Sequence, residues 1–263
     1  MSDNETCSST QLLEGMTSIS ALLASDAEIN NRRIERIWID RTKRRTKGAE
    51  IRFLQAKGQE LCFPVEFVDP ETLAKLTDGS SHGGIVAFCS ERTLPALCAE
   101  SITPGGLYVY LEGMEDPYNF GNALRSLYAA GVCGVVVPPR NWTSAAGVVA
   151  RASAGASERL PLLTADADTL IAAFRKAGYR ILCAGIRNSV SIYEQRFAYP
   201  LLLVIGGEKR GISRKILEQA DCIVRIDYGR AFRGSLSASA SAAVLAFELM
   251  RQNRTEALSP RDP

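Results

Sequence analysis

The segment LVIGGEKRGI, from Leu203 to Ile212, decides the fold that we predict for this chain of 263 residues. It continues the most apolar run of the sequence, Leu201–Ile205, directly into paired glycines and a charged turn. A continuous apolar run of this length is typical of a strand that is buried on both faces of a parallel sheet. Polar residues directly after such a strand predict a ligand site at its carboxyl end.

Strand-like and helix-like segments alternate around this strand from residue 107 onward. The alternation predicts an α/β fold in which helices cover both faces of a mostly parallel sheet. The predicted strands are Leu107–Leu111, Gly134–Val137, Ile181–Ala184, Leu201–Ile205 and Cys222–Ile226. The predicted helices are Asn119–Ala130, Thr143–Ala152, Asp166–Ala177, Ser213–Ala220 and Leu236–Arg251.

A smaller α/β unit precedes this region. Its predicted strands are Ile34–Asp40, Cys62–Phe67 and Gly84–Cys89, and its predicted helices are Thr46–Lys57 and Pro70–Leu76. The breaker residues of TLPA (Thr93–Ala96) and TPGG (Thr103–Gly106) are typical of a linker. We therefore expect one domain at 11–92, a linker at 93–105 and a second domain at 106–252.

The composition excludes several classes of protein. With 46% hydrophobic and 23% charged residues, the chain is typical of a globular protein. Its apolar runs are far shorter than the roughly 18 residues that cross a bilayer, and its first residues lack the features of a signal peptide. We expect a cytoplasmic protein with no membrane partner. The seven scattered cysteines contain no CxxC pair, which argues against a metal site and against a disulfide framework.

Basic residues gather in one short segment, although the net charge is only +2. The cluster consists of Arg41, Lys43, Arg44, Arg45 and Lys47. Such a cluster attracts phosphate, so one interpretation is that it binds an RNA backbone. The other interpretation is a solvated start of a helix, and the sequence does not separate the two.

Two further motifs accompany the opening segment. DPYNFGNALR (Asp116–Arg125) follows a predicted strand and enters a helix, where free N–H groups favour an anion. Arg125 is either a bidentate phosphate ligand or a surface arginine of that helix. GSLSASASAA (Gly234–Ala243) opens another helix, whose small residues suit close packing against a neighbour or a ligand.

Within the opening segment, the paired glycines Gly206 and Gly207 permit a close approach of the backbone to a ligand. Glu208 adds a carboxylate to the same turn. The alternative is a tight turn with a purely structural role. The pattern matches neither GxGxxG nor the phosphate loop GxxxxGK[ST].

In their order and spacing, the three motifs resemble the signatures of the SpoU (TrmH-like) RNA methyltransferases of the SPOUT superfamily. They are similar to DPxNxGAIxR, LVxGxExxGI and SLNVSxAAA of that family, and the similarity spans Gly106–Arg251. EGMTSISALL (Glu14–Leu23) and SHGGIVA (Ser81–Ala87) resemble the family's substrate-binding domain, an α/β domain similar to a ribosomal protein. His82, the only histidine, would then belong to RNA binding rather than to catalysis.

The resemblance implies a deep trefoil knot that binds S-adenosylmethionine, and a homodimer with residues of both subunits near the active site. It also implies methyl transfer to a ribose 2′-hydroxyl of structured ribosomal or transfer RNA. The residues that would bind the cofactor are Gly206, Gly207, Ile226 and Leu236. The residues that would form the reaction site are Asn119, Arg125, Glu208 and Ser235.

One position departs from the family motif, because Ser237 stands where the family has asparagine. Serine has a shorter reach and no amide pair, so Ser237 either takes over the role of the asparagine in catalysis or activity is weakened or lost. A catalytically weak or silent RNA-binding or ribosome-assembly protein is therefore the alternative function. A nicotinamide-dependent oxidoreductase is disfavoured, since the chain lacks GxGxxG and a carboxylate about 20 residues beyond it.

Overall fold

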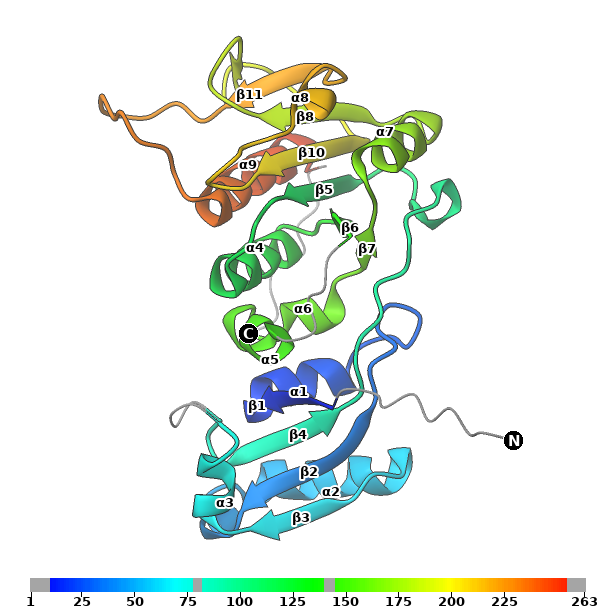
Figure 1. Ribbon diagram of the computed structural model, residues 1–263, viewed down its shortest axis with the longest axis vertical. Coiled ribbons are helices and arrows are strands. Elements are labelled where there is room, and N and C mark those ends of the chain that lie inside the picture. The colour runs from blue at the N-terminus through cyan, green and yellow to red at the C-terminus, as the bar shows by residue number, and fades with distance from the viewer. Residues whose placement is uncertain (1–9, 78–81, 140–144, 255–263) are drawn as a thin grey trace. The chain divides into compact units, whose positions relative to one another are not determined.

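The computed structural model describes residues 10–77, 82–139 and 145–254, and these form two compact units (Figure 1). Unit 1 contains the residues up to Thr93 together with Asn141–Arg159. Unit 2 contains Leu94–Arg140 and the residues from Leu160 onward.

In the described part of unit 2, seven strands form one sheet, and every neighbouring pair is parallel. The order is β7 (Leu162–Thr164), β6 (Gly134–Val137), β5 (Leu107–Glu112), β10 (Leu201–Gly206), β8 (Arg180–Ala184), β11 (Cys222–Arg225) and β9 (Val190–Ser191). The apolar strand β10 lies between β5 and β8, and its residues Leu201–Ile205 are at most 2% exposed. Its continuous apolar run therefore reflects burial on both faces of the sheet.

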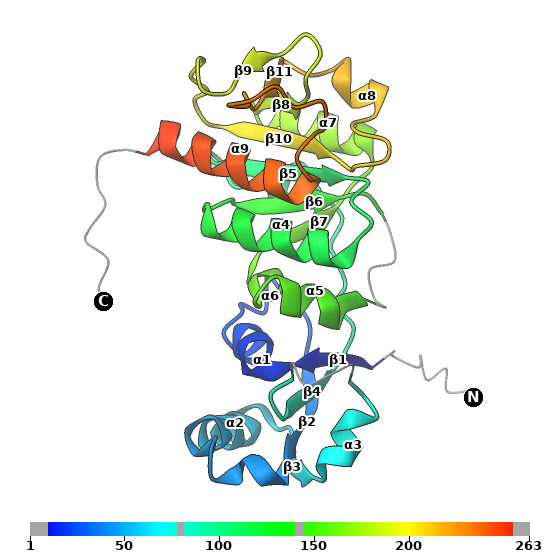
Figure 2. The same ribbon diagram turned by 90° about the vertical axis from the view of Figure 1, so that its left-hand side faces the viewer.

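Helices cover both faces of this sheet. Figures 1 and 2 show α4 (Pro117–Ala129) and α9 (Ala238–Asn253) side by side on one face, with α7 (Ala167–Lys176) on the other. Under α7, the rings of Tyr108, Phe174 and Tyr179 pack edge to face with centroids 5.1 to 5.8 Å apart. The 3-10 helix η2 (Ala99–Ser101) and the short helix α8 (Arg214–Leu217) complete the unit. The α/β prediction is confirmed.

Residues 94–105, which the sequence assigns to a linker, pack onto unit 2. The Leu97 N–H donates to the Thr164 carbonyl at 2.8 Å, and the Thr164 N–H donates to the Pro95 carbonyl at 2.9 Å. Leu97 and Ile102 are buried in the apolar core beside the sheet. The turn residues predict a break in secondary structure, but they carry no information on where the apolar residues between them pack.

In the described part of unit 1, four strands form a mixed sheet. The order is β1 (Gln11–Glu14), β4 (Ile85–Cys89), β2 (Ile34–Asp40) and β3 (Val65–Val68), with only the β2–β3 pair parallel. The helices are α1 (Gly15–Leu23), the 3-10 helix η1 (Arg41–Arg44), α2 (Gly48–Leu61), α3 (Pro70–Ala74), α5 (Ala146–Ala152) and α6 (Ala156–Arg159).

The helices α5 and α6 follow β6 of unit 2 in the sequence, yet they pack in unit 1. Ala150 of α5 belongs to the apolar core of unit 1. Gly147 allows this packing, because a Cβ there would lie 2.4 Å from the Leu12 carbonyl oxygen. The sequence assigns these helices to the domain at 106–252, because a short amphipathic pattern does not specify which sheet it covers.

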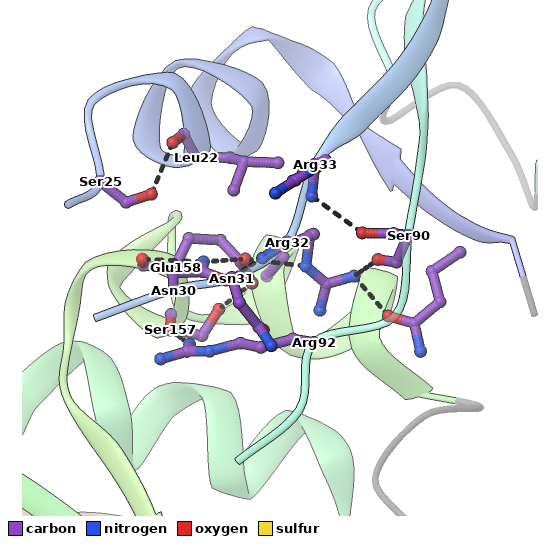
Figure 3. Close-up of polar contacts among 12 residues, drawn as sticks. Leu22, Ser25, Asn30, Asn31, Arg32, Arg33, Ser90, Arg92, Ser157 and Glu158 are labelled. Atoms are coloured by element: carbon purple, nitrogen blue, oxygen red, sulfur yellow. Dashed lines mark hydrogen bonds and ion pairs between the residues drawn. The ribbon is translucent and has the colours of Figure 1, made fainter. Parts of the chain in front are cut away.

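A buried polar network holds α6 in unit 1 (Figure 3). Glu158 is 2% exposed, and its Oε2 accepts hydrogen bonds from Asn30 Nδ2 at 2.8 Å and from Arg32 Nε at 3.1 Å. Arg92 donates to the carbonyl oxygen of Ser157 beside it. Burial lowers the pKa of Arg92 to about 10; Glu158 opposes this change, and the charge of Arg32 adds to it. Glu158 therefore offsets two buried positive charges.

Several elements differ in length from the prediction. The helix α2 continues to Leu61, and Cys62 ends it with a left-handed φ of 59°, so the strand predicted at Cys62–Phe67 begins only at Val65. The helix predicted at Ser213–Ala220 is reduced to Arg214–Leu217.

Two further differences lie at helix starts. The helix predicted from Leu236 begins at Ala238, because the Ser237 hydroxyl caps it. The helix predicted at Thr143–Ala152 corresponds to α5, and its first two residues lie outside the described part of the chain.

Candidate active site

A cavity of about 740 Å³ lies in unit 2 at the carboxyl ends of β8, β10 and β11. This is the edge where a parallel sheet is expected to bind a ligand. We call it the larger cavity. Its lining includes all four residues that the family resemblance assigns to the cofactor, namely Gly206, Gly207, Ile226 and Leu236.

The paired glycines keep two backbone segments in contact beside this cavity. A Cβ at Gly206 would lie 2.3 Å from the carbonyl carbon of Gly211, and a Cβ at Gly207 would lie 2.1 Å from the carbonyl oxygen of Gly113. The Gly211 N–H donates to the Gly207 carbonyl at 2.9 Å and closes the turn. The missing Cβ of each glycine thus admits neighbouring protein backbone, while both glycines still line the cavity. Any other residue would push these turns apart and change the wall of the cavity.

A smaller cavity of about 120 Å³ adjoins the larger one. Asn119, from the first turn of α4, lines it, and Glu208 and Ala238 line both cavities. Asp116 fixes this end of α4, since its carboxylate accepts the Asn119 N–H at 2.7 Å. The predicted reaction residues Asn119 and Glu208 therefore line one space, which shares Glu208 and Ala238 with the proposed cofactor space.

A line of hydrogen bonds connects Ser237 to this smaller cavity. The Ser237 hydroxyl accepts the Ala240 N–H at 3.2 Å and lies 3.0 Å from the Ser239 hydroxyl. Ser239 donates to Asn119 Oδ1 at 3.4 Å, so its single proton is used there and Ser237 is the donor to Ser239. Serine is one of the preferred N-cap residues, as asparagine is. The departure from the family motif therefore preserves the helix cap.

Two other predicted reaction residues lie farther out. Ser235 is exposed and lines the larger cavity. Arg125 is exposed on α4 and lines neither of these two cavities. Within one subunit the structure therefore brings Asn119, Glu208 and Ser235 to the two cavities but leaves Arg125 outside them.

The basic cluster lies in unit 1, in η1 and just before α2. Arg41, Arg44 and Arg45 are exposed, whereas Lys43 and Lys47 are half-buried. Arg41 pairs with Asp69 at 3.0 Å, and the Arg44 guanidinium lies 3.9 Å from the centre of the Phe67 ring. These contacts orient the side chains without burying their charges.

Sequence reasoning missed part of the lining of the larger cavity. Gly185 and Ile186 follow β8, and Tyr228 and Phe232 follow β11. Their positions directly after two predicted parallel strands were the available signal. These loops had no motif that distinguished them from ordinary connections.

The larger cavity fits S-adenosylmethionine in size and in lining. Its volume falls within the roughly 300 to 1,000 Å³ of small-molecule sites. The glycine turns offer main-chain groups, Ile186 and Leu236 offer apolar surface, and Glu208 offers a carboxylate that would suit a positively charged sulfonium. Within the described residues, no three His, Cys, Asp or Glu side chains gather as a metal site, and no helix has the length and apolar character to cross a membrane.

Two family models match the chain. Residues 106–247 match the SpoU rRNA Methylase family, and residues 12–95 match RNA 2′-O ribose methyltransferase substrate binding. The 23S rRNA (guanosine-2′-O-)-methyltransferase RlmB of Haemophilus influenzae is 30% identical over 217 residues, which cover 78% of this chain and 87% of the relative.

Solved structures share the fold. A crystal structure of an RNA 2′-O ribose methyltransferase has a TM-score of 0.74 and 25% identity, covering 92% of this chain and 88% of the other. The SpoU methyltransferase AviRb from Streptomyces viridochromogenes, solved with the cofactor AdoMet, has a TM-score of 0.74 and 21% identity, with coverage of 92% and 90%. The motifs, the sheet with its site at the strand ends, and these matches agree that the chain belongs to the SpoU rRNA methylase family.

Proposed function

We propose that this protein transfers a methyl group from S-adenosylmethionine to a ribose 2′-hydroxyl of ribosomal or transfer RNA. The observation that carries the proposal is the junction of the two cavities, where Glu208 and Ala238 line both the proposed cofactor space and the space beside Asn119. The name of the Haemophilus influenzae relative makes 23S rRNA the first RNA to test.

Bound S-adenosylmethionine supplies an activated methyl group on its sulfonium sulfur. The chain has to hold this group in line with the attacking ribose oxygen, because alignment at near-attack distance supplies much of the rate. Gly206, Gly207, Ile226 and Leu236 would bind the cofactor, largely through main-chain atoms. Asn119, Glu208 and Ser235 would orient the ribose at the junction of the cavities.

Ser237 would act on this site through Ser239. The Ser237 hydroxyl donates to Ser239, and the Ser239 hydroxyl donates to Asn119 Oδ1. The NH2 group of the Asn119 amide is then able to donate to a ribose oxygen. This arrangement supports an active enzyme rather than a silent RNA-binding protein.

We assign Arg125 to the RNA phosphate next to the reacting ribose. With a pKa above about 12, an arginine is a poor base at neutral pH, but its guanidinium binds phosphate oxygens in a bidentate manner. Arg125 would also polarise the hydroxyl, whose proton leaves to phosphate or water. Its position outside both cavities of its own subunit supports a homodimer in which each copy lends Arg125 to the other.

This assignment predicts that activity can be restored in trans. Arg125→Ala and Glu208→Ala should each be nearly inactive alone. If Arg125 acts across the dimer, random pairing should restore about one quarter of the wild-type sites, since half of the dimers are mixed and each holds one intact site. An unfolded and refolded equal mixture tests this, and each variant treated alone is the control. No recovery would show that Arg125 serves its own subunit or that no such dimer forms.

The rest of the proposal concerns RNA binding, the knot and the cellular location. We assign RNA-backbone binding to the basic cluster Arg41, Lys43, Arg44, Arg45 and Lys47 of unit 1. The deep trefoil knot and a cytoplasmic location, which the family resemblance and the RNA substrates of the relatives favour, complete the proposal.

A transfer assay tests the function directly. Purified protein, tritium-labelled S-adenosylmethionine and total RNA from cells lacking the gene should give a labelled 2′-O-methylated nucleotide, which mapping then identifies. Arg125→Lys should lose most of this activity, because the ammonium group cannot form the bidentate contact. Cofactor binding without transfer to any RNA would instead favour the silent RNA-binding protein.

A further inference from the structure

The loop between β11 and α9 carries two exposed aromatic side chains at the larger cavity. Tyr228 and Phe232 are 37% and 58% exposed, and both line this cavity. Figure 1 shows the segment as the orange loop that connects the two elements. Large exposed rings beside a cavity are typical of surfaces that bind a ligand or a partner.

The two rings support each other. Their centroids lie 5.8 Å apart with an angle of 61° between the planes. The Phe232 ring also packs against Gly234, where a Cβ would lie 2.6 Å from the ring. The glycine therefore lets the ring lie close to the backbone, and the pair forms a defined surface rather than two independent side chains.

A hydrogen bond ties this aromatic pair to the proposed cofactor residues. The Tyr228 hydroxyl accepts the Leu236 N–H at 3.2 Å. Leu236 lines the cavity, and an acceptor nitrogen of a heteroaromatic ligand would suit its N–H equally well. The Tyr228 hydroxyl thus occupies an N–H that a ligand could use, and its ring lies beside that position.

The pair lies on the part of the larger cavity that the smaller one does not share. Only Glu208 and Ala238 line both cavities, so a methyl group held near these two residues would be the one able to meet a ribose beside Asn119. Tyr228 and Phe232 would then contact a part of the cofactor other than its reacting methyl.

We propose that Tyr228 and Phe232 form a stacking surface for the adenine ring of S-adenosylmethionine. The inference rests on the proposed function, because it assumes that this cofactor occupies the larger cavity. Adenine is the flat, uncharged portion of the cofactor, and the faces of aromatic side chains bind such rings well. The methionine portion carries an ammonium and a carboxylate, which favour polar surroundings instead.

Calorimetry on the full-length protein tests the proposal without turnover. Titrations use S-adenosylmethionine and S-adenosylhomocysteine, which share the adenosine but differ in the charge on sulfur. Phe232→Ala and Tyr228→Ala should each raise the Kd of both ligands by roughly tenfold, as expected when a stacking partner is removed. Both side chains are exposed, so circular dichroism should show an unchanged fold.

Two matched variants serve as controls. Tyr228→Phe keeps the ring and removes only the hydroxyl that occupies the Leu236 N–H, so it should bind both ligands at least as tightly as the unchanged protein. Tyr193, which is 49% exposed and does not line the larger cavity, gives the second control. Tyr193→Ala should leave both Kd values unchanged.

Three results would overturn the proposal, and each has a different meaning. If the alanine variants weaken S-adenosylmethionine but not S-adenosylhomocysteine, the rings bind the sulfonium cation instead of adenine. If both ligands bind normally while the Kd for RNA rises, the rings stack on a base of the RNA and the proposed function stands. If the unchanged protein binds neither ligand, the proposed cofactor fails together with this inference.

Discussion

Glu158→Ala should destabilise unit 1 strongly, because it removes the acid from a buried network that contains two arginines. Glu158, Arg32 and Arg92 are 2%, 8% and 9% exposed. The substitution removes hydrogen bonds from Asn30 and Arg32 and leaves the two guanidinium charges without their buried carboxylate. Removing one partner of a buried ion pair costs about 3 to 5 kcal/mol. A fall in melting temperature of roughly 10 to 20 °C should follow for a unit of this size.

Urea unfolding measures this loss. In a Trp142→Phe background, Trp38 is the only tryptophan, and it lies on β2 of unit 1. Its fluorescence then reports the unfolding of the unit that contains the network. The matched control is Glu60→Ala, which removes an acid of the same unit from the ion pair with Lys57, where the side chains are 59% and 31% exposed. That change should cost no more than about 0.5 kcal/mol, since water screens the pair.

A second pair of variants separates charge from packing. Glu158→Gln keeps the shape and loses the charge, so its loss of stability should lie between zero and that of Glu158→Ala. The double variant Arg32→Met with Glu158→Leu should lose less than the sum of its single changes, because both charges leave the interior together. If Glu158→Ala costs as little as Glu60→Ala, the reasoning about buried charge is refuted.

Three further predictions concern the cap, the acid limb and the thiols. Ser237→Ala should lower the free energy of unfolding by about 1 kcal/mol, measured by thermal unfolding, and should lower the rate of methyl transfer. Ser237→Asn, which also caps a helix, should keep both the stability and the activity. Unchanged activity of the alanine variant would contradict the role of the hydrogen bonds from Ser237 to Asn119. Burial raises the pKa of Asp221, but hydrogen bonds from Arg175 and the Ile181 N–H outweigh this effect and lower the pKa overall. The carboxylate therefore stabilises the native state at pH values above its ordinary pKa of 3.8. This contribution disappears as the pH falls through the lower pKa of the native state. Asp221→Asn should therefore flatten the acid limb of a stability–pH curve, and an unchanged curve would contradict this. Burial raises the pKa of Cys89 and Cys183 to about 12, so iodoacetamide at pH 8 should label the exposed Cys62 and Cys98 and leave the two buried thiols unlabelled until the protein unfolds, as peptide mass spectrometry would show.

The sequence predicts the fold best where one local pattern determines the element. The strands at Ile34–Asp40 and Gly134–Val137 have the predicted bounds, because each is a short apolar or alternating run between turn residues. The strands β7 and β9 were missed, since three and two residues carry no periodic signal and such strands form only beside an existing sheet. Helix α5 was predicted, but its place in unit 1 depends on long-range contacts of its side chains.

The same distinction applies to the candidate site. The motifs shared with the family named four cofactor residues, and all four line the larger cavity, where the topology of a parallel sheet brings strand ends together. They did not predict Tyr228 and Phe232, whose position depends on the path of an irregular loop. They also gave no information on which subunit Arg125 serves, because an exposed helix position is compatible with either.

The return of α5 and α6 to unit 1 limits how this protein can be divided or recombined. In a chimaera that takes only residues 1–93 from a relative, the relative's residue at position 32 would face the native Glu158. A fragment beginning at residue 94 would expose Ala150 of α5, which the apolar core of unit 1 now buries. A domain exchange should therefore carry residues 141–159 together with the N-terminal part. The natural module for evolution and engineering is discontinuous in the sequence.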